Sequence, residues 1–162
     1  MATIFVSYSD DDVGFVLNLV RILKQNGAPV WMDQYDIAPE ARRDRAIEQA
    51  LRESSHLLVL VSKTSVTTPR VRAEIDFAIR NHKSIIPVLL DEVSLPSPIR
   101  SMQSVDFRRA NMTAQSYAAA LERLLQTLPL SEDRPARKLG GDEPTLLDAQ
   151  RGAATGEDEE IE

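Results

Sequence analysis

The sequence contains no cysteine and only two histidines, His56 and His82, among its 162 residues. The absence of cysteine excludes a disulfide framework, a thiol nucleophile and a thiolate metal site. Neither histidine has another metal-binding residue close to it in the sequence, so a zinc site is not expected. We therefore look for a site that works without a metal.

Long apolar runs are also missing, and the chain does not open with the basic and then apolar pattern of a signal peptide. We therefore expect a cytoplasmic protein that makes no use of a membrane. The net charge is −6, and residues 131–162 hold ten Asp or Glu against four Lys or Arg, which accounts for all of it. The remainder is neutral and has no basic stripe, which argues against nucleic acid as the main ligand.

The composition changes after Pro129. The segment that follows holds four of the six glycines and few large aliphatic residues, so burial there cannot offset the entropy of ordering the chain. We expect one domain over residues 1–129 and an acidic, disordered tail over residues 130–162.

The clearest structural pattern spans residues 57–90. Apolar runs at 57–62 and 84–90 predict two strands buried on both faces, and the helical period between them predicts a crossover helix over 69–81. Thr68 suits the N-cap of this helix, and Pro69 suits its first position. This stretch predicts two parallel strands joined by a helix.

The same alternation continues along the whole chain. Further strands are expected at residues 3–8, 29–33 and 104–107, and helices at about 13–26, 40–53 and 113–128, with a polar loop over 33–39. Ser9 and Asp12 suggest a capping box, and we favour helix capping by Asp10, Asp11 and Asp12 over a metal site. The pattern predicts a doubly wound α/β sheet.

Glu74 is the unusual residue of the crossover helix. At about 100° per residue it lies at the border of the apolar stripe formed by Val71, Ile75 and Ala78, which covers at least half of it. It also lies near the carboxyl ends of the strands, where open α/β sheets bind ligands. A functional carboxylate and a surface ion pair with Arg70 both fit this position.

Several segments in order resemble a TIR (Toll/interleukin-1 receptor homology) domain over residues 1–128. They are residues 4–9 (IFVSYS), 31–33 (WMD), 36–39 (DIAP), 46–51 (AIEQAL), 59–62 (VLVS), 69–78 (PRVRAEIDFA) and 86–90 (IPVLL). The set is more similar to the soluble or bacterial branch than to receptor tails. The resemblance implies a flavodoxin-like three-layer α/β sandwich with a five-stranded parallel sheet in the order 2-1-3-4-5.

The resemblance also implies one of two functions. Many TIR domains are signalling modules that associate with other TIR domains through the BB loop, which corresponds here to Asp36, Ile37, Ala38 and Pro39. Others hydrolyse NAD⁺ at the nicotinamide–ribose bond with a glutamate at the position of Glu74. Breaking that bond leaves an oxocarbenium-like ribose and neutral nicotinamide, so a carboxylate can stabilise the charge without a metal or a bound cofactor.

On this interpretation Glu74 is catalytic, and Tyr8, Asp33, Arg43 and Arg70 bind the substrate NAD⁺. Arg43 and Arg70 stand where enzymatic relatives often have aromatic residues. Arginine also stacks on rings and binds pyrophosphate. An Arg70 that only pairs with Glu74 would instead leave a non-catalytic adaptor.

Two other functions are alternatives on the same fold. A phosphoacceptor receiver domain needs an aspartate at the end of the third strand, where this chain has Ser62 and Lys63, so it is excluded. A nucleoside-processing transferase with similar glutamate chemistry remains an alternative. We expect NAD⁺ hydrolysis by an assembly of TIR domains.

Overall fold

A computed structural model describes residues 2–37 and 42–130 of the chain. The strands are β1 (Ile4–Ser7), β2 (Val30–Trp31), β3 (His56–Val61), β4 (Ser84–Leu89) and β5 (Val105–Asp106). The α-helices are α1 (Val13–Gln25), α2 (Asp33–Asp36), α3 (Arg43–Glu53), α4 (Pro69–Arg80) and α5 (Ala114–Thr127), with short 3₁₀ turns between them. Ala38 and Pro39 of the predicted BB loop, and the predicted tail beyond residue 130, lie outside the described residues.

The five strands form one parallel sheet in the order β2-β1-β3-β4-β5, which confirms the predicted fold class and strand order. β1 and β3 are neighbours near the centre, with Ser7 beside Val59, and β3 continues as far as Val61 beside Leu89 of β4. The carboxyl ends of these strands therefore meet at one edge.

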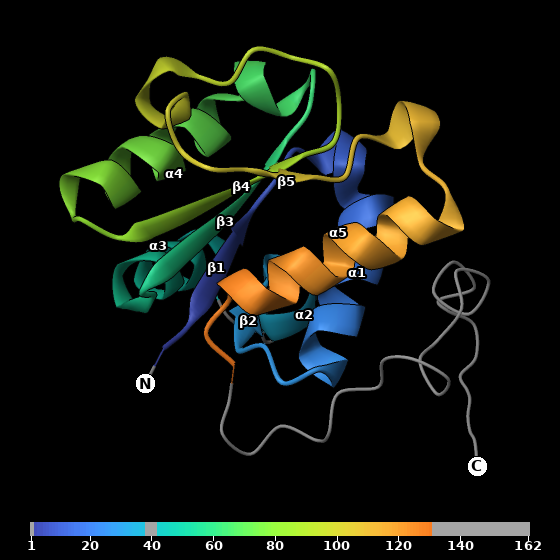
Figure 1. Ribbon diagram of the computed structural model, residues 1–162. Coiled ribbons are helices and arrows are strands. Elements are labelled where there is room, and N and C mark those ends of the chain that lie inside the picture. Colours follow the sequence, from blue (N-terminus) through green and yellow to red (C-terminus); the bar gives the residue numbers. More distant parts are fainter. Residues whose placement is uncertain (1, 38–41, 131–162) are drawn as a thin grey trace.

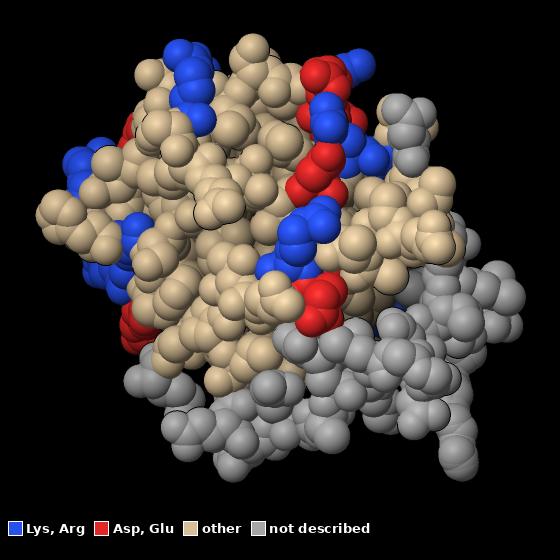
Figure 2. All heavy atoms as spheres, viewed as in Figure 1, with Lys and Arg blue, Asp and Glu red and all other residues tan. Residues whose placement is uncertain are grey.

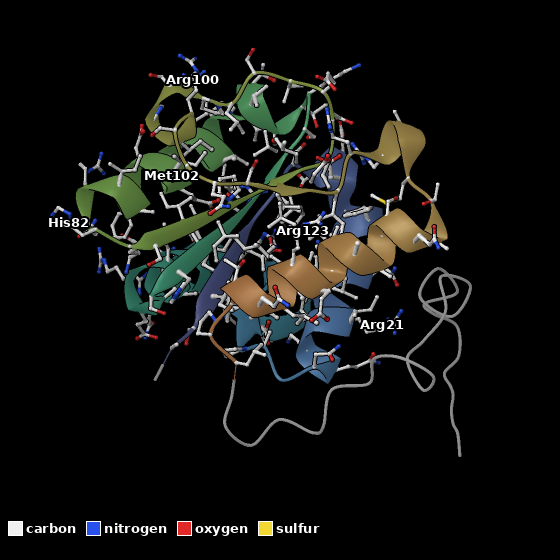
Figure 3. All side chains as sticks on the ribbon, in the orientation of Figure 1. Arg21, His82, Arg100, Met102 and Arg123 are labelled. Atoms are coloured by element: carbon white, nitrogen blue, oxygen red, sulfur yellow. The ribbon has the colours of Figure 1, made fainter. Side chains whose placement is uncertain are left out.

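Helices cover both faces of the sheet (Figure 1). α1 and α5 pack on one face, where Val16, Val20 and Leu124 belong to the larger apolar cluster. α3 and α4 pack on the other, where Leu51, Val71 and Ile75 belong to the second cluster. Side chains fill both layers, with Arg123 on the α5 side and Met102 on the α4 side (Figure 3).

Alternation along β1 decides which layer each side chain enters. Ile4, Val6 and Tyr8 belong to the cluster under α1 and α5, whereas Phe5 belongs to the cluster under α3 and α4. Because successive side chains point to opposite faces, Ser7 points toward α4. The last residues of β1 therefore contribute side chains to both layers.

Two predicted boundaries are wrong. Asp33 to Asp36 form a helical turn rather than a loop, because Met32 O accepts hydrogen bonds from the backbone N–H groups of Tyr35 and Asp36. In addition, the side chain of Asp36 accepts a hydrogen bond from the backbone N–H of Met32 at 2.8 Å. The third helix begins at Arg43, later than the predicted residue 40.

Two predicted caps are confirmed in position but not in their bonding. Thr68 is the N-cap of α4 and Pro69 holds its first position, as predicted, but the Thr68 hydroxyl donates to Thr64 O at 2.7 Å and makes no capping bond. Ser9 accepts from Asp11 N, whereas the predicted reciprocal partner Asp12 is buried. No helix of the described residues is long and apolar enough to cross a membrane.

Candidate functional site

The carboxylate of Glu74 lies under the carboxyl end of β1. Glu74 is 4% exposed, and the Ser7 hydroxyl donates to its Oε1 at 2.5 Å. Its Oε2 lies 3.7 Å from the guanidinium of Arg70, one turn earlier on α4. The sequence placed Glu74 at the border of the apolar stripe, but the structure buries it between the helix and the sheet.

The protonation of Glu74 follows from this burial. Burial raises the pKa of Glu74 to about 7, and the nearby Asp33 charge adds to the rise, while the Ser7 hydrogen bond and the Arg70 charge lower it. Both the ionised and the neutral form of Glu74 are therefore populated at neutral pH. A carboxyl group with this pKa at a sheet edge is typical of functional sites.

Tyr8, Asp33 and Arg43 form a second group beside it. The buried Tyr8 hydroxyl donates to Asp33 Oδ1 at 2.6 Å, and Arg43 donates to Asp33 Oδ2. Burial, followed by the hydrogen bond to Asp33, raises the pKa of Tyr8 above its usual range. The phenol therefore stays protonated and acts as a donor.

Arg70 joins the two groups. It donates to the backbone oxygen of Tyr8 at 2.8 Å, and its guanidinium lies 5.4 Å from the centre of the Tyr8 ring. It also lies 3.6 Å from Asp10 and is 33% exposed. Arg70 thus contacts Glu74 and is itself accessible to solvent.

The structure brings all five predicted catalytic and substrate-binding residues together in one chain of contacts. It runs from Arg43 through Asp33, Tyr8 and Arg70 to Glu74. Ser7 was not predicted as part of the site. The alternation of side chains along β1 is the sequence signal that could have placed it opposite Glu74.

Two residues of the predicted BB loop, Asp36 and Ile37, are described by the structure, and Asp36 makes contacts within the domain. Asp36 pairs with Lys24 of α1 at 3.0 Å, besides its bond to Met32 N, so it is not a free contact group. Ile37 is half-buried directly after α2. Tyr35, which is not among the predicted site residues, is the one exposed large hydrophobic side chain of the described residues, at 45%. Its hydroxyl donates to Leu17 O at 3.2 Å, and Lys24 lies 5.0 Å from the centre of its ring. Tyr35 and Ile37 are thus the accessible apolar side chains at this end of α2.

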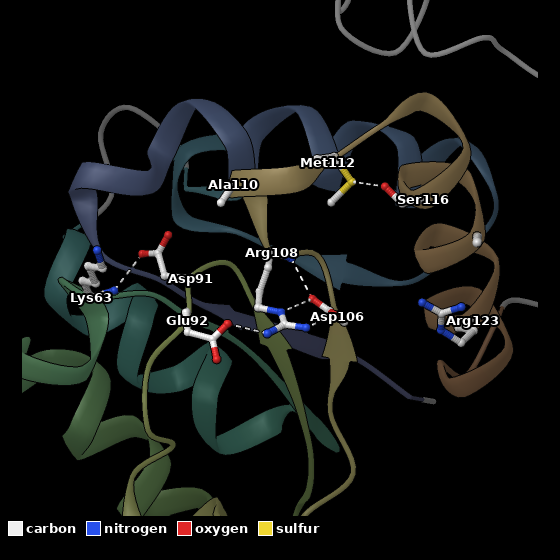
Figure 4. A pocket seen from close by; sticks show the side chains of 10 residues that line it. Lys63, Asp91, Glu92, Asp106, Arg108, Ala110, Met112, Ser116 and Arg123 are labelled. Atoms are coloured by element: carbon white, nitrogen blue, oxygen red, sulfur yellow. Dashed lines mark hydrogen bonds and ion pairs between the residues drawn. The ribbon is translucent and has the colours of Figure 1, made fainter.

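A separate pocket with a volume of about 480 Å³ lies on the α5 side of the sheet (Figure 4). Its lining includes three cations and three anions, and Arg108 contacts both Glu92 and Asp106 within it. Acidic and basic side chains alternate in a column on this face of the molecule (Figure 2). The pocket includes none of the predicted site residues, and its charged side chains carry no net charge.

A partly buried network of hydrogen bonds and ion pairs lies at the carboxyl edge on the side of α1. The Ser62 hydroxyl, at the end of β3, donates to Asp12 Oδ2 at 2.5 Å. Arg109 lies 3.1 Å from Asp12 and 3.1 Å from Asp91. Asp12 is therefore a structural acceptor. In the part of the chain that the structure describes, no cluster of three or more His, Asp or Glu could hold a metal ion.

Comparison of the sequence with protein families finds a match to the TIR domain over residues 4–125. Comparison with curated proteins finds no match.

Solved structures with the same fold include several TIR domains. The TIR domain of the Toll-related receptor TRR-2 from Hydra magnipapillata has a TM-score of 0.61 at 19% identity, covering 76% of this chain and 97% of that one. The TIR domains of the activated Roq1 resistosome, which directly recognises the pathogen effector XopQ, have a TM-score of 0.62 at 14% identity, covering 78% and 99%. A prokaryotic SEFIR domain has a TM-score of 0.56 at 23% identity, covering 85% and 99%. At these identities the likeness concerns the fold.

Proposed function

Because the chain belongs to the TIR-domain family, we propose that it is a signalling protein that associates with other TIR domains and, when assembled, hydrolyses NAD⁺ at the nicotinamide–ribose bond. The observation that carries this proposal is Glu74: a buried carboxylate at the carboxyl edge of the sheet, with a pKa of about 7 and one oxygen facing an arginine.

The main group that the reaction requires from the protein is a carboxylate held beside the ribose. The C1′–N bond of NAD⁺ breaks with its electron pair going to nicotinamide, which leaves as a neutral molecule. The ribose becomes oxocarbenium-like, and an ionised Glu74 beside it stabilises the positive charge. Water then forms the new C1′–O bond and releases a proton.

The chain of contacts supports the proposed substrate-binding roles. Arg43 is 55% exposed and Arg70 is 33% exposed, so both guanidinium groups reach solvent at the edge of the site. They suit the two negative charges of the pyrophosphate. Tyr8 and Asp33 hold these arginines in place from beneath.

The burial of Glu74 supports a need for assembly. A ligand reaches Oε2 only after Arg70 moves aside, because Arg70 faces that oxygen. The contacts from Arg43 to Arg70 link the start of α3, which follows the predicted BB loop, to Glu74. Docking of another TIR domain at Tyr35 and Ile37 would therefore act on the site through Asp33, which begins the same helical turn.

A non-catalytic adaptor is the second candidate, and the same burial favours it. Both oxygens of Glu74 already have a partner without any ligand, Ser7 on Oε1 and Arg70 3.7 Å from Oε2. In that case the surface of Tyr35 and Ile37 would carry the whole function, through association with other TIR domains.

Nicotinamide release from NAD⁺ separates the two candidates. Purified protein is incubated with NAD⁺ and a crowding agent that favours assembly. The wild type should turn over NAD⁺, and Glu74→Gln, which keeps the shape but not the charge, should lose most of the rate. Asp76→Asn, an exposed carboxylate on the same helix, is the matched control and should keep the wild-type rate.

Equal inactivity of wild type and Glu74→Gln under assembling conditions, with no thermal protection by NAD⁺, would refute the enzymatic proposal. Self-association that persists in both proteins would then support the adaptor.

A further inference from the structure

The last two residues of β1 each hold one of the two buried carboxylates of the site. The Ser7 hydroxyl donates to Glu74 at 2.5 Å, and the Tyr8 hydroxyl donates to Asp33 at 2.6 Å. Each carboxylate also has an arginine on its other oxygen, Arg70 for Glu74 and Arg43 for Asp33. The strand end therefore presents two hydroxyl donors to two carboxylates, one on each face of the sheet.

The two partners of Glu74 differ in how firmly they hold it. Ser7 is fully buried on a strand that pairs on both sides, with β2 and with β3. Arg70 is partly exposed, lies 3.7 Å from Oε2, and divides its contacts among Glu74, Asp10 and the backbone of Tyr8. Ser7 is thus the fixed partner, and Arg70 is the one that can leave.

We propose that Ser7 is the positioning residue for Glu74: its hydroxyl fixes Oε1, so that Oε2 is the oxygen presented to the substrate. The inference rests on the proposed function for its kinetic readout only. A hydrogen bond to an ionised acceptor stabilises that form over the protonated one, so the loss of Ser7 makes Glu74 a weaker acid.

Other charged groups near Glu74 act in the opposite direction or from further away. Asp33 of α2 raises the pKa of Glu74, and Arg70 of α4 lowers it. Arg43 of α3 neutralises Asp33, and Asp10 competes for Arg70. Ser7 is the hydrogen-bond donor that lowers the pKa of Glu74 directly, so its removal has a definite sign.

The test compares Ser7→Ala with Ser7→Thr, which keeps the hydroxyl. In Ser7→Ala the low-pH limb of nicotinamide release should move upward by about one pH unit, the size expected when a hydrogen bond to a charged group is lost. The rate at pH 7 should fall, and raising the pH to 9 should recover most of it. Ser7→Thr should restore the wild-type profile.

Ser62→Ala is the matched control. It also removes a buried strand-end hydroxyl that donates to a carboxylate at 2.5 Å, but on Asp12 rather than Glu74. It should leave the pH profile in place even if it lowers the melting temperature. A shift in both variants would mean that the effect is structural, and would overturn the assignment of Ser7.

Direct titration of the Glu74 carboxyl carbon by NMR keeps this inference separate from the proposed function. A wild type without NAD⁺ hydrolysis would refute the proposed function, and the NMR titration would still show whether Ser7→Ala raises the pKa of Glu74. An unchanged titration would overturn the role of Ser7, whatever the activity. If Ser7→Ala does not fold, Ser7→Cys, which keeps a weaker donor, serves in the same comparison.

Discussion

Replacing Glu74 by glutamine should stabilise the fold at high pH, even though it is expected to abolish activity. Folding raises the pKa of this group from 4.5 to about 7, so the folded protein binds the proton more tightly than the unfolded chain does. Above pH 7 the wild type must keep an ionised carboxylate in a buried position. The difference corresponds to about 3 kcal/mol, which glutamine does not incur.

The difference in stability between wild type and Glu74→Gln should grow with pH. Below pH 4.5 Glu74 is neutral in both states, so wild type and Glu74→Gln should be about equally stable. Between pH 4.5 and 7 only the unfolded chain loses its proton, and the wild type loses stability as the pH rises. Above pH 8 the gap is complete, and it should amount to roughly 10 °C in melting temperature for a domain of this size.

Thermal unfolding of both proteins at pH 4 and pH 8 measures this difference. Asp76→Asn is the control, because it removes an exposed carboxylate from the same helix and should change little at either pH. A Glu74→Gln variant that is no more stable than wild type at pH 8, or is equally stabilised at both pH values, would refute the reasoning. The burial of Glu74 would then carry no electrostatic cost.

Further predictions concern Arg70, Ile37 and the last helix. Arg70→Trp should weaken NAD⁺ binding, because it removes one of the two guanidinium groups proposed to bind the pyrophosphate; faster nicotinamide release at unchanged NAD⁺ binding would show instead that Arg70 only covers Glu74 Oε2. Ile37→Asp should weaken self-association in analytical ultracentrifugation, and sedimentation identical to wild type would exclude this surface. Thr113→Ala breaks the capping box with Ser116 and should cost about 1 kcal/mol in chemical denaturation; an unchanged midpoint would contradict this.

The sheet could be predicted from the sequence because its strands and helices have strong, separate periods. Residues 57–62 and 84–90 are continuously apolar, and α4 between them has a regular stripe with Pro69 at its start. The structure has strands and a helix at these places within one or two residues. The order of the strands came from the family resemblance and is confirmed.

The local details were harder to predict, because they depend on residues far apart in the chain. Asp12 looks like a helix-capping residue in sequence, but Ser62, fifty residues later, draws it into a buried hydrogen bond. Ser7 lies 67 residues from Glu74. The turn at Asp33 forms because Lys24 of α1 and the backbone of Met32 hold Asp36. Such contacts follow from tertiary packing, and a local sequence pattern cannot predict them.

The two edge strands, β2 and β5, have two residues each. A neighbouring chain that joins a sheet by strand addition needs a longer row of free backbone groups to bind to. This sheet therefore offers almost no template for such pairing, and the edges resist aggregation by the same property. Copies of this domain that assemble are therefore expected to contact each other through side chains on helices and loops. Such contacts can form and break without a change in the pairing of the central strands.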